Sequence, residues 1–305
     1  MLDYRVHTFL AVYRSRSFTQ AARELHITQP AVSQHIRHLE RHYGARLFEK
    51  TTRGAEPTEA GRTLYRALSV MENDEQRLCA ELRSGTQGAD ATPLHLGCTR
   101  TVADYAVPRI LAQRAAALPA KPICMRVGNT AELLALMDTG EVDCALVEGS
   151  FDRTAFDFAV FSREPFIAVA SPEQAERLRA GGAQGIEGLL GARLILREAG
   201  SGTRDILERN LAAHDLGTGD FAGVIELASI PAILACVEAG AGISFLYRIA
   251  AERELTAGTL VDITPRDFTI EHDFSLVWQR GSIYADSYRA LLRAWRKVAG
   301  AGATR

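Results

Sequence analysis

Residues 17–61 carry the pattern that most restricts what this chain can fold into: a short capped helix, a turn, a longer amphipathic helix and a basic hairpin. Ser17 and Gln20 have the spacing of a capping box, so they predict the start of the short helix. After the turn, Thr28 can cap the longer helix, and Pro30 is tolerated in its first turn because no amide hydrogen is needed there. This order of elements predicts a helix-turn-helix followed by a wing.

The longer helix of this region has one apolar and one polar face. Four residues recur at helical spacing and predict the buried stripe: Val32, Ile36, Leu39 and Tyr43. Glutamine, serine and arginine side chains on the other face are of the types that hydrogen-bond base edges and phosphates in a DNA groove. These polar-face residues are Gln29, Pro30, Ser33, Gln34 and Arg37. An ordinary solvated helix face is the alternative interpretation, and the neighbouring elements favour DNA.

A basic hairpin is predicted over residues 49–57, with Arg53 at its turn. An arginine at such a tip can enter a minor groove, where the negative potential of DNA is enhanced. His35, His38 and His42 fall on one side of the preceding helix, a spacing that could align metal ligands. Contact with phosphate or solvent explains these histidines more simply, so we predict no metal site.

Residues 1–61 resemble the winged helix-turn-helix of LysR-type transcriptional regulators. The resemblance rests on a long ordered match, SFTQAARELHITQPAVSQHIRHLERHYGARLFEK followed by PTEAG. In that family, the polar-face positions named above approach bases or phosphates, and the residue matching Arg53 enters the minor groove. Many members have arginine where this chain has Gln34, which leaves the base preference at that contact open. The predicted DNA-binding residues are Ser17, Gln20, Thr28, Gln29, Pro30, Ser33, Gln34, Arg37 and Arg53.

Charge is distributed unevenly along the chain. Residues 1–61 contain nine Lys and Arg against six Asp and Glu, a net charge of +3, which leaves −5 for the rest of a chain whose total is −2. A basic head on an acidic body fits nucleic-acid binding by the head alone.

The cysteines and the hydropathy of the chain indicate the cellular compartment in which the protein is expected. The five cysteines are scattered and odd in number, which argues for reduced thiols rather than disulfides or a zinc site. The sequence has no apolar run long enough to span a membrane and no apolar signal segment at its N-terminus. We therefore expect a cytoplasmic protein without membrane contact.

The segment 62–90 is predicted to be a linker helix followed by a hinge. Its apolar residues recur at steps of four and three, as in a short coiled-coil seam, behind a cap at Thr58. The seam residues are Leu64, Leu68, Met71, Leu78 and Leu82, with Glu75 as the polar interruption. The alternative is that this helix packs on its own domain. Because the helix lies between two domains and precedes a hinge at 84–93, we favour a dimer seam. A dimer presents two recognition helices to dyad-symmetric DNA, and the resemblance implies dimers that commonly assemble into tetramers.

Over residues 91–305, strands alternate with helices, which predicts an α/β domain built on parallel sheets. The predicted strands are residues 94–98, 123–127, 144–147, 166–170, 194–196, 224–227, 243–246 and 274–278, and the predicted helices are residues 102–116, 132–139, 202–214, 231–239 and 285–298. The resemblance implies two lobes like those of periplasmic binding proteins, joined by two crossovers. We place lobe I at about 91–162 and 268–300, lobe II at about 163–267, and the crossovers near 161–164 and 264–271. The whole chain is thus expected to be α/β with an all-α winged helix-turn-helix at its N-terminus. A ligand would lie between the lobes, beside the C-terminal ends of strands.

Three polar segments follow predicted strands and open predicted helices, beginning at Cys98, Gly128 and Arg197. Hydroxyls, free amides and arginine at a helix N-terminus favour an anion, such as a carboxylate, a phosphate or an inorganic oxyanion. Helix capping is the alternative for each segment taken singly, and the three together favour a small anionic metabolite or oxyanion as effector. The predicted effector-binding residues, several of which match cleft positions of the family, are Thr99, Arg100, Thr101, Asn129, Thr130, Glu148, Ser201 and Thr203.

The favoured function is a DNA-binding regulator whose promoter affinity responds to this ligand. Its expected partners are double-stranded DNA, the effector, further copies of the chain and RNA polymerase; no cofactor is expected. One rival is an enzyme with a regulatory DNA-binding head, but His95, His214 and His272 lie far apart in sequence and no catalytic set emerges. A second rival is an architectural DNA-binding protein without an effector. Cys98 would add redox sensing if its thiolate were favoured, although a buried, inert thiol is the commoner state.

Overall fold

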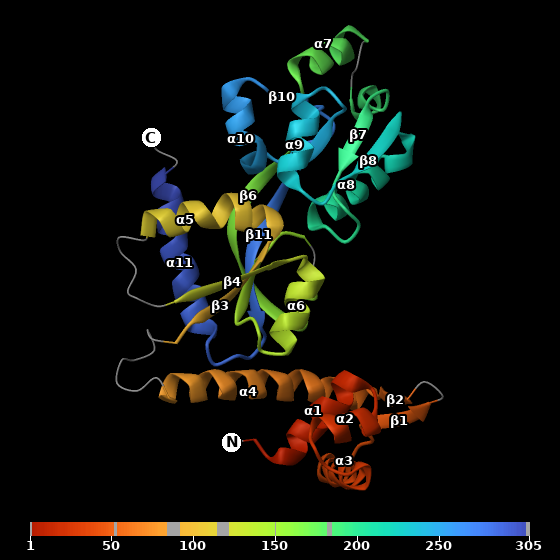
Figure 1. Cartoon of the computed structure of the whole chain (residues 1–305), viewed down its shortest axis with the longest axis vertical. Coiled ribbons are helices and arrows are strands. Elements are labelled where there is room, and N and C mark those ends of the chain that lie inside the picture. The colour runs from red at the N-terminus through yellow and green to blue at the C-terminus, as the bar shows by residue number, and fades with distance from the viewer. Residues whose placement is uncertain are drawn as a thin grey trace.

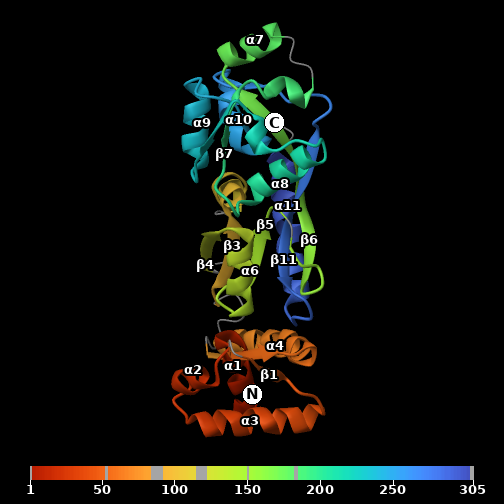
Figure 2. The same ribbon diagram turned by 90° about the vertical axis from the view of Figure 1, so that its right-hand side faces the viewer.

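The computed structural model describes residues 2–51, 54–83, 92–114, 122–149, 151–181 and 185–302. The molecule is long and narrow, with the N-terminal helices at one end and two lobes stacked on them (Figures 1 and 2). Helix α4 (Glu59–Arg83) lies across the long axis between these helices and the lobes. Among the described residues, no helix is long and apolar enough to cross a membrane. Arg53 and most of the predicted hinge at 84–93 lie outside the described residues.

The N-terminal elements, called the head, form the predicted winged helix-turn-helix. They are α1 (Tyr4–Ser15), α2 (Phe18–Glu24), α3 (Gln29–Tyr43), β1 (Phe48–Thr51) and β2 (Gly54–Pro57). The Ser17 hydroxyl accepts a hydrogen bond from the Gln20 amide at 3.2 Å, and the Thr28 hydroxyl accepts one from the Ala31 amide at 3.4 Å. These contacts confirm both predicted helix starts. Gly44, at a φ of 66°, ends α3 in the left-handed conformation that favours glycine.

The head and the first half of α4 share one apolar core. Val32 of α3 and Phe9 of α1 are fully buried in it. Tyr43 was predicted on the same buried stripe of α3, but it is 46% exposed because it lies in the last turn of the helix, beyond this core. Tyr65 of α4 stacks on Tyr13 with ring centroids 3.7 Å apart, and Leu68 is also part of this core. Because this contact is apolar and continuous, the head and α4 behave as one packed unit.

The predicted seam of α4 divides into two parts. Leu68 is buried in the head core and Leu64 packs against it, as the alternative interpretation of this helix required. Further along, Met71, Leu78 and Leu82 are 54%, 42% and 72% exposed. This outer part of α4 is the portion still available to a second copy, so the dimer seam stays a prediction for these three residues.

Lobe I is a sheet with α6 (Thr130–Asp138) on one side and α11 (Ala285–Gly302) on the other (Figure 2). A π-helical turn (Val102–Ala106) leads into α5 (Val107–Arg114) beside α11. The strands of the sheet are β3 (Leu94–Thr99), β4 (Ile123–Gly128), β5 (Cys144–Val147), β6 (Phe156–Ala170) and β11 (Ile270–Gln279). β3 runs parallel to β4 and β5, whereas β11 is antiparallel to β5 and β6.

Two long strands, β6 and β11, connect the lobes. Their pairing extends from Phe156 opposite Gln279 to Phe166 opposite Ile270. The crossovers predicted near 161–164 and 264–271 fall within β6 and at the approach to β11. The chain passes from lobe I to lobe II along β6 and returns along β11, so the two strands run in opposite directions. The expectation of purely parallel sheets is therefore wrong at these two strands.

Lobe II carries the remaining elements. Its strands are β7 (Arg193–Leu196), β8 (Gly223–Glu226), β9 (Ser244–Tyr247) and β10 (Val261–Asp262). Its helices are α7 (Pro172–Ala180), α8 (Gly202–Ala212), α9 (Ile230–Glu238) and α10 (Arg248–Ala257), with short 3-10 turns at Ile186–Leu189 and Thr218–Asp220. Of these elements, the alternation of strands and helices in the sequence predicts β7, β8, β9, α8 and α9. It does not predict α7, α10 or β10. The loops before α6 and α8 face the other lobe and position the candidate site.

Candidate functional site

The polar face of α3 lies at the outer end of the molecule (Figure 2). Gln29, Gln34 and Arg37 are exposed on it, while Ser33 is half-buried. The Gln29 amide donates to the Ser33 hydroxyl at 3.0 Å, and the Arg37 guanidinium donates to the Ser33 carbonyl at 3.3 Å. These bonds lie along the helix surface and can be exchanged for bonds to DNA.

Arginines flank the C-terminal half of this face. Gln34, Arg37, Glu40, Arg41 and Arg46 line one open groove beside α3. Arg46 lies 3.9 Å from the Glu40 carboxylate. The guanidinium groups of Arg37 and Arg41 favour phosphate oxygens, which planar forked donors bind well.

The remaining predicted DNA-binding residues lie at helix starts. Gln20, Thr28 and Pro30 are exposed, and Ser17 is half-buried. The hydroxyls of Ser17 and Thr28 are engaged as helix caps, so their first role is structural. The position of Arg53, predicted to enter a minor groove, is outside the described residues.

Two of the three α3 histidines contact α1. The Thr8 hydroxyl lies 2.9 Å from His35 Nδ1, and Arg5 Nη1 lies 3.2 Å from His38 Nε2. These contacts account for the two rings as part of the packing between α1 and α3.

Between the lobes, four of the predicted threonines converge on Glu148, which follows β5 and is 2% exposed. Glu148 Oε1 accepts from the hydroxyl of Thr101 in lobe I and from that of Thr203 in lobe II, each at 3.1 Å. The Glu148 amide donates to Thr99 Oγ1 at 3.4 Å, and the Thr130 hydroxyl donates to the Glu148 carbonyl at 2.8 Å. Glu148 therefore joins the two lobes at the centre of the predicted cleft, not at its rim.

A close backbone approach accompanies this junction. A Cβ atom at Gly202, in the first turn of α8, would lie 3.1 Å from the Glu148 carbonyl oxygen. A larger side chain there would push α8 away from β5, so glycine is required for the lobes to meet at Glu148.

Two predicted effector residues have other principal contacts. Asn129 caps α6, accepting from the Glu132 amide at 2.9 Å while Glu132 accepts from the Asn129 amide. Arg100 is half exposed, and its Nε lies 3.7 Å from Glu198 Oε1 of lobe II. Asn129 thus follows the capping interpretation, and Arg100 forms a salt bridge between the lobes.

The structure adds Arg197 and Tyr247 to the cleft. Arg197 is 3% exposed and holds Glu198 through two hydrogen bonds of 2.8 and 2.9 Å, leaving its second terminal nitrogen, Nη1, without a partner among the described residues. Tyr247, the last residue of β9, is fully buried, and its hydroxyl is likewise unpartnered. The signal for Tyr247 was its place directly after a predicted strand at 243–246, where cleft residues are expected.

The ionisation of Glu148 is strongly perturbed. Burial raises the pKa of Glu148 from 4.5 to about 7, although hydrogen bonds from Thr101 and Thr203 and the charge of Arg197 oppose that rise. Burial and the negative charge of Glu148 raise the pKa of the Tyr247 hydroxyl well above its usual range. Glu148 therefore exchanges a proton close to neutral pH, while Tyr247 stays protonated.

The redox alternative for Cys98 is not supported. Cys98 is fully buried, and this burial raises the pKa of its thiol to about 12. A thiol with such a pKa is almost entirely protonated at neutral pH and reacts slowly with oxidants.

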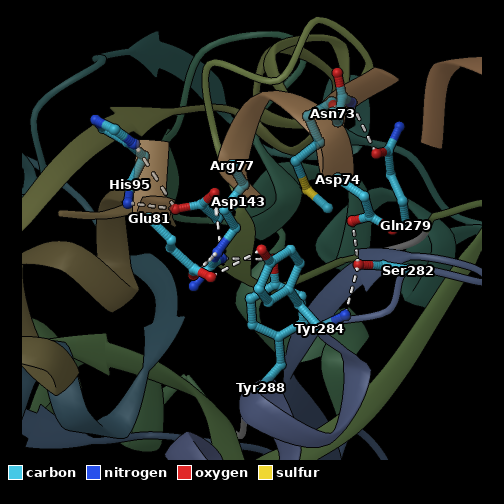
Figure 3. A network of polar contacts seen from close by, with 11 residues as sticks. Asn73, Asp74, Arg77, Glu81, His95, Asp143, Gln279, Ser282, Tyr284 and Tyr288 are labelled. Atoms are coloured by element: carbon cyan, nitrogen blue, oxygen red, sulfur yellow. Dashed lines mark hydrogen bonds and ion pairs between the residues drawn. The ribbon is translucent and has the colours of Figure 1, made fainter. Parts of the chain in front are cut away.

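The second half of α4 contacts lobe I through polar side chains, and we call this contact the joint (Figure 3). The Asn73 amide donates to the Met137 carbonyl and to Gln279 Oε1, both at 2.8 Å. Arg77 donates to the Tyr288 hydroxyl at 2.9 Å and lies 3.3 Å from Asp143 Oδ1. The joint is polar, whereas the contact between α4 and the head combines an apolar core with the pairing of Glu72 with His7 and Arg14, each at 2.8 Å.

Further contacts complete the joint. Both Asp74 carboxylate oxygens accept hydrogen bonds, one from the Ser282 hydroxyl at 2.7 Å and one from the Ile283 amide at 2.9 Å. The Arg77 guanidinium also lies 4.2 Å from the centroid of the Tyr284 ring. From the head, Arg14 donates to the carbonyl of Asp138 at 3.3 Å.

Two elements of lobe I extend from the cleft to the joint. α6 begins beside Glu148, through Thr130, and ends at the carbonyls of Met137 and Asp138, which the joint and the head contact. β5 is preceded by Asp143, the partner of Arg77, and followed by Glu148. A nine-residue helix spans about 14 Å, so a displacement at the cleft can reach the joint through one rigid element.

Comparison with known proteins identifies relatives for both halves of the chain. A family described as bacterial regulatory helix-turn-helix protein, lysR family, matches residues 4–62, and LysR substrate binding domain matches residues 87–300. An uncharacterized HTH-type transcriptional regulator of Escherichia coli (strain K12), YeiE, is 31% identical over 260 residues, covering 85% of each chain. The HTH-type transcriptional regulator CbbR of Rhodospirillum rubrum is 30% identical over 291 residues, covering 94% of this chain and 93% of CbbR.

Solved structures share the fold over nearly the whole chain. Full-length LysG of Corynebacterium glutamicum with bound effector Arg has a TM-score of 0.68 at 21% identity, and 98% of each chain is covered. ArgP of Mycobacterium tuberculosis has a TM-score of 0.65 at 20% identity, with 97% of each chain covered.

Proposed function

Because this chain belongs to the LysR family of bacterial transcriptional regulators, we propose that a small anionic effector, held between lobes I and II, controls its binding to promoter DNA. The chain is a DNA-binding transcriptional regulator with an effector-binding domain. We divide it into a DNA-binding domain at 1–61, a linker at 62–90 and an effector domain at 91–305. LysG was solved with bound effector Arg, which supports a small-molecule effector for this chain as well.

One observation carries the effector proposal. Hydroxyls from both lobes meet at the single buried residue Glu148, so one polar part of the contact between the lobes passes through this side chain. Buried polar contacts of this kind lose much of their stabilisation when a partner is displaced. A ligand that binds here changes how the lobes pack, and α6 and β5 transmit that change to the joint.

The DNA-binding part of the proposal rests on α3. Its exposed face combines amide and guanidinium donors at the outer end of the molecule, where the described residues leave it uncovered. We propose that Gln29, Ser33 and Gln34 contact bases and that Arg37 contacts phosphate. The comparisons favour this function over an enzyme, since the relatives are transcriptional regulators.

We further propose a homodimer that binds dyad-symmetric DNA in the cytoplasm. The exposed residues Met71, Leu78 and Leu82 of α4 give an apolar stripe for a second copy. Two heads held by one linker pair would contact two half-sites, and pairing of dimers would give a tetramer. Where the regulator activates, RNA polymerase would be a further partner.

Substitution of Arg37 tests the role of α3. Arg37→Ala should weaken binding to promoter DNA and reduce the salt dependence of log Kd by about one unit, because one phosphate contact is lost. Fluorescence anisotropy on the upstream DNA of the gene, at several salt concentrations, measures both quantities. Arg179→Ala, on α7 at the opposite end of the molecule, is the matched control. An Arg37→Ala protein with unchanged affinity and slope would remove α3 from the proposed interface.

A further inference from the structure

Four buried polar atoms near the junction of the lobes have no hydrogen-bond partner among the described residues. They are Glu148 Oε2, Arg197 Nη1, Ser201 Oγ and the Tyr247 hydroxyl. Their residues are between 0% and 4% exposed. Buried polar groups in folded proteins are nearly always paired, because an unpaired one forfeits its bonds to water. Four in one region indicate a place that a polar ligand completes.

The four atoms come from segments that meet at the junction. Ser201 is the N-cap residue of α8, but its hydroxyl makes no capping hydrogen bond, and Thr203 in the first turn of this helix bonds to Glu148. The charge of Arg197 acts on the ionisation of Glu148, and the charge of Glu148 acts on that of Tyr247, so Arg197 and Tyr247 both lie within electrostatic range of Glu148. Lobe I supplies only Glu148, and lobe II supplies the other three.

The chemistry of the four atoms defines the ligand. Arg197 Nη1, Ser201 and Tyr247 can each donate a hydrogen bond, which suits the oxygens of an anion. The fourth atom, Glu148 Oε2, belongs to a carboxyl group that would repel an anion when ionised. The conflict disappears if one proton is held between the carboxyl group and the ligand, on either partner.

We propose that the cleft binds a small oxyanion together with one proton, with Arg197, Ser201 and Tyr247 as donors to the anion and Glu148 sharing the proton. This inference rests on the proposed function and specifies the ligand of the same cleft. The proton moves with the ligand: either the anion arrives protonated and donates to ionised Glu148, or protonated Glu148 donates to the bare anion. Both routes give the same bound state and charge.

The surrounding charges support this balance. The Arg197 guanidinium is already paired with Glu198, which also lies near Arg100, so it does not supply a free positive charge to cancel a second anion. Glu164 also raises the pKa of Tyr247, which keeps the hydroxyl protonated as a donor. The tendency of Glu148 to hold a proton near neutral pH agrees with the proposed bound state.

Isothermal titration calorimetry on the full-length protein tests the proposal. The probes are sulfite, bicarbonate, phosphate, sulfate and acetate, each titrated in two buffers of different ionisation enthalpy. Sulfate stays fully deprotonated across the pH range. At pH values above the pKa of Glu148, we expect each bound sulfate to be accompanied by uptake of about one proton, and the affinity to fall by about tenfold per pH unit.

The substitution Glu148→Gln removes the titratable carboxyl group and leaves the other groups of the site in place. Glutamine keeps the shape of the side chain and an oxygen that accepts from Thr101 and Thr203. Its amide group donates a hydrogen bond to the anion at every pH. The variant should therefore bind the same anion without proton uptake and without this pH dependence. Tyr247→Phe should weaken binding by about tenfold, the loss of one donor. Glu254→Gln, at another buried glutamate on α10, is the control and should behave as the unmodified chain.

The outcomes are distinguishable. Sulfate that binds above the pKa of Glu148 with no proton uptake, or whose affinity keeps the same pH dependence in the Glu148→Gln variant, overturns the proton inference and leaves the proposed function standing. If none of the probes binds while the protein still responds to an uncharged or cationic compound, the anion assignment is wrong. If nothing binds and DNA affinity never changes, water alone completes the four atoms and the effector proposal also fails.

Discussion

At the scale of single residues, Glu148 has the largest effect on how the effector domain is assembled. Its carboxylate accepts from Thr101 and Thr203 across the lobe boundary, and its backbone contacts Thr99 and Thr130. The sequence predicted all five residues as cleft residues, since each follows a strand or opens a helix. It could not predict that they contact one another, nor that Tyr247 lies beside them. Such contacts depend on how two lobes pack, which local patterns do not specify.

The raised pKa of Glu148 predicts a pH-dependent stability. The folded protein binds this proton more tightly than the unfolded chain, so the resulting stabilisation is complete below about pH 4.5 and is lost as the pH rises through about 7. The loss is on the order of 3 kcal/mol. Chemical denaturation of the ligand-free protein between about pH 5 and pH 8 should show this decline, and Glu148→Gln should reduce it. A decline of the same size in both proteins would assign it to other groups.

At the scale of elements, patterns with clear boundaries were predictable. The strand at Cys144–Val147 and the caps at Ser17 and Thr28 were found where the sequence placed them. β6 was predicted only from Phe166, because its first part alternates with charged residues such as Arg163 and resembles a loop. Helix α7 was missed since it contains few apolar residues and is exposed over most of its surface. Helix α10 was missed since most of its apolar residues are alanines, which alternate with charged residues and give a weak pattern.

The joint gives a prediction at this scale. Arg77 is only 9% exposed and contacts Asp143, Tyr284 and Tyr288. Arg77→Ala removes the guanidinium partner of the nearly buried Asp143 carboxylate, which keeps its contacts with His95, and loosens α4 from lobe I at a cost of about 2 kcal/mol. We expect the change in DNA affinity caused by the effector to fall towards onefold, while the Kd values of DNA alone and of effector alone shift by less than about threefold.

Paired titrations of DNA with and without a binding anion measure this coupling. Arg289→Ala, on α11 outside the joint, is the control. Intact coupling in the Arg77→Ala protein would exclude the joint as the route from the cleft to the head.

At the scale of the whole molecule, the order of parts explains the control of DNA binding. The recognition helix and the effector cleft lie far apart along the long axis, with α4 between them (Figure 1). The head shares an apolar core with α4, supported by the pairing of Glu72 with His7 and Arg14, whereas α4 is held to lobe I by polar contacts. In the proposed dimer, we therefore expect a ligand to change the orientation of the two heads more readily than the structure of either head.

The dimer seam is testable through the exposed part of α4. Leu78→Glu combined with Leu82→Glu should convert the dimer into monomers at micromolar concentrations, because the charges would be buried in the seam without partners. Sedimentation velocity measures the mass, and circular dichroism verifies the fold. Thr63→Glu, exposed on the same helix outside the seam, should remain dimeric. A doubly substituted protein that stays dimeric would place the interface elsewhere.

The most direct test of effector-controlled DNA binding is a footprint of the purified full-length protein on the DNA upstream of its own gene, at fixed salt and with one oxyanion varied at a time. We predict protection over a dyad-symmetric site whose length or boundaries change with one anion and stay constant with the others. In the Glu148→Gln protein, we expect the same protection, and the effect of the anion on the footprint should no longer depend on pH. Protection that is identical under every anion and every pH would contradict effector control, because the head would then bind DNA independently of the cleft.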